Sequence, residues 1–206
     1  MDNNKHLEDL AHIRSMMEGS TRFISLSGLS GVGAGISALI GAAVIYYTSG
    51  SIVSDYSRVN PRWLNMDFMY FQVLVALIVL AMALSSGLFF TIRRAKRKGQ
   101  KLFTKASIRM LINLAIPLFA GGIFCLLLMY HSYWVLVGPC TLIFYGLALL
   151  NCSKYTLNDL RTLGIAEIIL GLLCTFLLHY TLIFWAVGFG VLHIVYGLLM
   201  YFKYEK

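Results

Sequence analysis

The chain contains six apolar segments, each long enough to cross a lipid bilayer as a helix. An α-helix needs roughly 20 apolar residues to cross a hydrocarbon core ~30 Å thick. Because lipid offers the backbone no hydrogen-bond partners, segments of this length are expected as helices. The sequence therefore predicts an all-α membrane protein, a six-transmembrane-helix bundle. The expected spans are residues 23–47, 68–92, 110–130, 133–152, 162–180 and 182–202.

The composition excludes an ordinary soluble domain. Hydrophobic residues make up 59% of the chain, charged residues 13%, and the mean hydropathy is +0.76. Soluble domains usually have about 45–50% apolar and about 25% charged residues. The net charge of +8 does not indicate a nucleic-acid partner, since eight of the 17 basic residues lie between Arg93 and Arg109, directly beside apolar spans. We expect membrane lipid, and no nucleic acid, as the partner of this charge.

Basic residues also predict the orientation. With the N-terminus in the cytoplasm, 15 Lys and Arg residues lie on the inner side and only Arg58 and Arg62 on the outer side. Short loops rich in Lys and Arg stay in the cytoplasm, so both termini are expected there. The basic middle loop has one of two roles in this prediction. Its charges either only hold the loop on the cytoplasmic side, or also bind anionic lipid headgroups. The candidate headgroup ligands are Arg93, Arg94, Lys96, Arg97, Lys98 and Lys101.

Residues 1–22 precede the first span and are too polar to cross a membrane. Apolar residues such as Leu7, Leu10 and Met17 recur near helical spacing among charged ones. This pattern predicts a cytoplasmic amphipathic helix that lies on the inner surface or docks on the bundle. A partly frayed tail is the alternative. Residues 23–206 form the transmembrane domain in this division.

Helices 3 and 4 resemble helices 5 and 6 in sequence. Residues 122–125 (GIFC) match residues 171–174 (GLLC), and residues 145–147 (YGL) match residues 196–198 (YGL). Each unit is a whole hairpin, so the two copies would cross the membrane in the same direction. The pattern predicts repeated hairpins related by an axis along the membrane normal.

The first span carries small residues at helical spacing. Gly31 and Gly35 are one turn apart, and Ala34 and Ala38 belong to a neighbouring stripe. A glycine-rich phosphate loop would need a preceding strand and a following soluble helix, whereas this segment lies inside an apolar span. Small residues at this spacing let helix backbones approach closely, so we assign them to helix packing.

Glu167 is the only acidic residue inside an expected span. It lies about five residues from the inner end of the fifth span, roughly 7 Å deep. An ionisable group at that depth is costly and normally faces protein or water. It could belong to a proton, cation or solute site, or to interhelical hydrogen bonds that stabilise the fold. The polar residues expected near its level are Tyr196, His193, Tyr145, Asn113 and Asn151.

No catalytic or metal-binding motif is evident. The four cysteines have neither CxxC spacing nor histidines at ligand spacing, so no metal and no cofactor is expected. Only one acidic residue lies within the expected spans, which gives few groups for acid–base catalysis of hydrolysis. The sequence therefore does not favour an enzyme. We favour a structural, sensing or partner-binding membrane component. A small proton- or cation-coupled transporter or channel that uses Glu167 is the alternative, and a homo-oligomer or a protein partner is possible in either case. A lipid-modifying enzyme is a more distant third.

Two further segments carry a family resemblance. Residues 13–18 (IRSMME) followed by residues 22–31 (RFISLSGLSG), together with residues 188–197 (GFGVLHIVYG), resemble an uncharacterised family of small bacterial six-helix multi-pass membrane proteins. The resemblance implies a bacterial cytoplasmic (inner) membrane location and the six-helix architecture. It implies no substrate, cofactor or catalytic residue.

Overall fold

The computed structural model describes residues 27–49, 66–97, 99, 104–157 and 159–206, and the elements formed within these ranges are all helical. The expected amphipathic segment 1–22 and the start of the first span lie outside the described residues. The helices longer than ten residues are α2 (Gly28–Ser49), α3 (Met66–Arg97), α4 (Lys105–Tyr130), α5 (Val137–Cys152), α6 (Asp159–Phe176) and α8 (His193–Tyr204).

The last expected span is built from several helical segments. After the short 3₁₀ turn η3 (Leu178–Tyr180), the chain continues through α7 (Thr181–Trp185) and the π-helix η4 (Ala186–Leu192) into α8. A π-helix is wider than an α-helix and is uncommon, and it often marks a functional position. The expected span at residues 182–202 is thus helical, and it contains a π segment that the apolar pattern does not predict.

Five helical segments of the described chain are long and apolar enough to cross a membrane, which fits an all-α, multi-pass membrane bundle. Helix α6 is not among them. Its 18 residues include three charged ones, Asp159, Arg161 and Glu167. It also ends at Phe176, before the expected end of the fifth span at residue 180.

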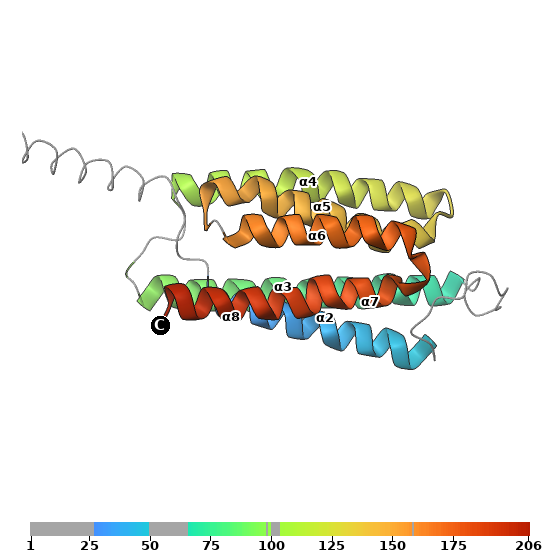
Figure 1. The fold of residues 1–206 in the computed structure, drawn as a ribbon, viewed down its shortest axis with the longest axis horizontal. Helices are drawn as coiled ribbons and strands as arrows, with labels where there is room; N and C mark the ends of the chain where they lie inside the picture. The colour runs from blue at the N-terminus through green and yellow to red at the C-terminus, as the bar shows by residue number, and fades with distance from the viewer. Residues whose placement is uncertain (1–26, 50–65, 98, 100–103, 158) are drawn as a thin grey trace, which may run out of the picture.

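The long helices form two groups, which Figure 1 shows one above the other. Helices α4, α5 and α6 pack together in one group, and α2 packs against both α3 and α8 in the other. The groups are connected through η3 and α7, and contacts of α6 with η4 and α8 join them along their length. A seam between two helix groups therefore runs past α6.

Glycines allow close backbone contact within the group of α2, α3 and α8. A Cβ atom added to Gly31 would lie 3.1 Å from the Cα of Gly197, and one added to Gly35 would lie 2.6 Å from the carbonyl oxygen of Gly190. Ala38 is buried against Val75 and Val79 of α3. The glycine stripe of α2 thus faces η4 and α8, while Ala38 faces α3; Ala34 is half-buried.

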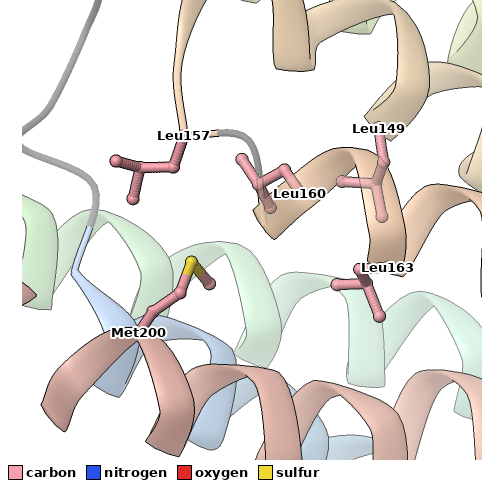
Figure 2. Close-up of a cluster of buried hydrophobic side chains, with 5 residues drawn as sticks. All are labelled: Leu149, Leu157, Leu160, Leu163 and Met200. Atoms are coloured by element: carbon pink, nitrogen blue, oxygen red, sulfur yellow. The ribbon is translucent and has the colours of Figure 1, made fainter. Parts of the chain in front are cut away.

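An apolar cluster closes the seam near the start of α6. Figure 2 shows Leu160 and Leu163 of α6 near Leu149 of α5, with Met200 of α8 reaching toward them from the other group. Leu157 completes the buried set. Burial of side chains of this size stabilises a fold by roughly 1.5–3 kcal/mol each when it removes them from water. This cluster fixes the position of the two groups at one end of the molecule.

Candidate functional site

Glu167 is fully buried in the seam between the two helix groups, with an exposed fraction of 0%. It lies on α6, between Gly164 and Gly171, whose positions touch the backbone of α5. Because the backbones of α5 and α6 are this close, there is no room for the carboxyl group between these two helices. It points toward the η4 segment instead, where it meets Gly188.

His193 is the second polar residue of the site, and two hydrogen bonds orient its ring. Nδ1 lies 3.0 Å from the carbonyl oxygen of Gly188, and Nε2 lies 2.7 Å from the hydroxyl of Tyr145. A carbonyl oxygen only accepts, so Nδ1 carries the hydrogen and donates it. In the neutral ring Nε2 is therefore the acceptor, and the hydroxyl of Tyr145 donates to it.

The carboxyl group of Glu167 lies beside this pair without joining it by a regular hydrogen bond. Oε1 is 3.5 Å from Nδ1 of His193. Among the described residues, neither carboxyl oxygen of Glu167 has a hydrogen-bond partner. A buried polar group without a partner costs about 1–3 kcal/mol, and more if it is charged. The site therefore holds a group whose hydrogen-bonding capacity is unused in this conformation.

The π segment creates the room in which these groups meet. A Cβ atom added to Gly188 would lie 2.5 Å from Oε2 of Glu167 and 2.6 Å from Cδ2 of Leu142. Only glycine leaves space for the carboxyl group at this position. The carbonyl of Gly188 accepts from the His193 ring five residues later, so the π segment both contacts Glu167 and orients His193.

Aromatic rings surround the His193 side of the site. The ring of Phe189 lies 6.0 Å from that of His193, and 5.1 Å from that of Tyr145. Trp185 follows, with its ring centroid 5.0 Å from Phe189. These rings cover the polar groups and connect them to an indole whose fluorescence can report on the site.

The polar cluster expected from the sequence is divided in the structure. Glu167, His193 and Tyr145 come together. Asn151 instead donates to the backbone carbonyl of Asn113 at 3.0 Å, and so links α5 to α4. Tyr196 packs against the apolar cluster around Leu160, as Tyr145 also does, but no hydrogen bond joins it to Glu167 or His193 among the described residues.

The expected headgroup ligands also have different environments. Arg93, Lys96 and Arg97 are exposed, whereas Lys98 and Lys101 lie outside the described residues. Arg94 differs from the expectation because it is buried, with an exposed fraction of 6%. Its Nη1 forms an ion pair of 3.3 Å with Oε1 of Glu205.

A second ion pair joins α6 to α8 outside the expected spans. Asp159 accepts from Lys203 Nζ at 3.1 Å and from the Tyr204 hydroxyl at 2.7 Å. Burial acts to raise the pKa of Asp159, but the hydrogen bonds from Tyr204 and Lys203 outweigh it and lower the pKa below its ordinary value.

Sequence reasoning missed Gly188 and Glu205. Gly188 is one of two glycines that flank Phe189 inside an apolar span, and this spacing was a signal that the helix there is irregular. Glu205 is a single acid among basic residues at the end of the chain, and nothing in the sequence indicates that it reaches Arg94.

Comparison with protein-family models, with curated proteins and with solved structures gives no match to this chain in any of the three.

Proposed function

We propose that this chain is a proton-responsive, six-crossing membrane protein, with both termini in the cytoplasm, that acts as a sensing component through Glu167. One observation carries the proposal: both carboxyl oxygens of a fully buried Glu167 lack a hydrogen-bond partner among the described residues. A carboxyl group that served only to join helices would be expected to hydrogen-bond across the interface. An intramembrane acid without that role is a candidate functional group.

The seam supports a sensing mechanism. Gain or loss of a proton at Glu167 changes the charge beside Gly188, and Glu167 belongs to α6 whereas Gly188 belongs to η4. A charged carboxylate would attract the Nδ1–H of His193, now 3.5 Å away, away from the Gly188 carbonyl. A neutral carboxyl group would leave the His193–Gly188 hydrogen bond intact. The protonation state therefore biases how the two helix groups meet.

Trp185 provides a test, because its ring contacts Phe189, which stacks on His193. The other two tryptophans are replaced by phenylalanine, and the emission of Trp185 is recorded over a pH range in the full chain. We expect a pH-dependent change that Glu167→Gln abolishes. The matched control is Asp159→Asn, an acid at the end of the same helix, which should leave the change in place. An identical titration with and without Glu167 would reject the proposal.

A proton-coupled transporter is the second candidate, and a chain of proton positions favours it. A proton that reaches the hydroxyl of Tyr145 could pass to Nε2 of His193 at 2.7 Å. Nδ1 would then release its own proton to Oε1 of Glu167 once the 3.5 Å separation shortens. The Tyr145 hydroxyl gains one proton and loses one. The His193 ring gains one at Nε2 and loses one at Nδ1, so it becomes the other neutral tautomer, and the carboxylate of Glu167 ends with the transferred proton.

Liposomes that contain a pH-sensitive dye separate the two candidates. The wild-type chain, Glu167→Gln and empty liposomes are compared after a pH jump, with an added cation gradient in a second series. Flux above the empty-liposome level that requires Glu167 supports transport. Wild-type flux at the empty-liposome level, together with a Trp185 response, supports sensing alone.

The proposed orientation has its own test. Reporter proteins that are active on only one side of the membrane are fused after residue 206 and within residues 98–103. We expect both positions to report the cytoplasm. A reporter on the opposite side at either position would contradict the proposed topology.

A further inference from the structure

A cavity of about 240 Å³ lies where α2 begins and where α3 and α8 end. Three arginines of α3 line it, Arg93, Arg94 and Arg97, and Leu29 and Phe90 supply an apolar wall. Guanidinium groups bind phosphate oxygens in a bidentate manner. Three of them beside an apolar surface suit a ligand that has both a phosphate group and an apolar part.

The protein's own tail shows that this place accepts an anion. Oε1 of Glu205 accepts from the backbone N–H of Gly28 at 2.5 Å and from Oγ of Ser27 at 3.1 Å, and it pairs with Arg94 at 3.3 Å. Gly28 is the first residue of α2, where the unpaired N–H groups and the helix dipole favour negative charge. A carboxylate thus already lies against a helix N-terminus, a hydroxyl and a guanidinium group.

The charges that line the cavity do not cancel. Among the described residues that line it, three arginines face one carboxylate, so their charges sum to +2. Arg94 is buried and pairs with Glu205, whereas Arg93 and Arg97 are exposed at the cavity. Exposed arginines next to an apolar span lie at the level of lipid headgroups in a protein that crosses the membrane here.

We propose that this cavity binds the phosphate group of an anionic lipid headgroup. Arg93 and Arg97 hold the phosphate oxygens, and Leu29 and Phe90 contact the glycerol and the first methylene groups. Glu205 keeps Arg94 and the start of α2 in place, and its negative charge competes with the phosphate for the arginines. This site lies in the group of α2, α3 and α8, whereas Glu167 belongs to α6 in the other group. The proposal does not depend on the function of Glu167.

The test uses the full chain in a neutral detergent and measures the midpoint of thermal unfolding as ligand is added. The ligands are dioctanoyl-phosphatidylglycerol, inorganic phosphate and dioctanoyl-phosphatidylcholine. We expect the first to raise the midpoint in a saturable manner, and Arg93→Gln/Arg97→Gln to weaken its binding about tenfold or more. Phosphatidylcholine also contains a phosphate, but its choline group makes the headgroup neutral overall. An equal effect of phosphatidylcholine would overturn the proposal, because the net negative charge of the headgroup would then contribute nothing to binding.

The matched control is Lys96→Gln/Arg109→Gln, which removes the same charge from exposed positions that do not line the cavity. This control should bind phosphatidylglycerol nearly as well as the wild type. Equal weakening in both double variants would reduce the effect to diffuse attraction and overturn the proposal. Saturation by inorganic phosphate, with the same dependence on Arg93 and Arg97, would support the site and assign it to a free phosphate.

A third variant keeps the proposal testable if the arginine pair is needed for folding. Glu205→Gln removes the competing charge and should tighten the binding of phosphatidylglycerol several-fold. Weaker binding in this variant would contradict an anion site at this cavity.

Discussion

Oε1 of Glu167 lies 3.5 Å from Nδ1 of His193, yet the hydrogen on that nitrogen is donated to the carbonyl of Gly188. The two titratable groups are close enough to interact but do not form a regular hydrogen bond in this conformation. A small movement of η4 relative to α6 would exchange one acceptor for the other.

Replacement of Glu167 by methionine should stabilise the protein. Methionine has a similar length and no charged group, so it removes a buried carboxyl group that has no hydrogen-bond partner within the described part of the chain. We expect the free energy of unfolding to rise by about 1–3 kcal/mol, while the pH response of Trp185 is lost. Denaturant unfolding in detergent measures the first quantity.

Glu205→Gln is the contrasting variant for that measurement. The Glu205 carboxylate is bonded to Gly28, Ser27 and Arg94, so its replacement should lower stability. If replacement of either acid lowered stability equally, the proposal that the Glu167 carboxyl group does not stabilise the fold would be wrong.

Tyr145→Phe should destabilise the protein because it removes the donor to Nε2 of His193. A buried ring nitrogen without a partner costs about 1–3 kcal/mol. Tyr196→Phe makes the same chemical change at a tyrosine that packs on the apolar cluster, and its effect should be smaller. Thermal unfolding of both variants gives the comparison, and equal losses would argue against the Tyr145–His193 bond.

Gly188→Ala should disrupt the site by steric contact. The added methyl group would meet Oε2 of Glu167 at 2.5 Å and Leu142 at 2.6 Å. Overpacking of this kind costs typically about 1–3 kcal/mol, and the Trp185 response should change with it. Gly122→Ala is the control, since a Cβ atom there meets nothing within 4 Å. That variant should be neutral or slightly more stable, because alanine favours helix.

The lowered pKa of Asp159 predicts that the folded protein loses stability in acid. Its pKa is lowered in the folded protein, so the carboxylate stabilises the fold fully above the ordinary value of about 4. This contribution is lost as the pH falls through the lowered pKa. We expect Asp159→Asn to flatten the decline of the unfolding midpoint between about pH 5 and pH 3, the interval around that ordinary value. Tyr204→Phe should flatten it partly, because Lys203 still donates to the carboxylate.

The helical character and the approximate spans follow from the sequence alone. In lipid, an apolar segment of this length can pair its backbone N–H and C=O groups only by forming a helix. The fifth span was the exception: its charges shorten the apolar part of α6, and the helix ends at Phe176. The glycines of α2 could be assigned to packing from their spacing. Their partners on η4 and α8 could not, since residues so distant along the chain meet only in the folded bundle.

The sequence also indicates Glu167, because an acidic residue inside an apolar span is rare and costs free energy to place in the membrane. It did not separate Glu167, His193 and Tyr145 from Asn113, Asn151 and Tyr196, which are all expected in the inner half of the bundle. Depth is a property of position along one helix, whereas contact depends on how each helix is rotated toward its neighbours. Only the tertiary structure decided that rotation, through the close packing of α5 on α6 and the π segment that brings Gly188 against Glu167.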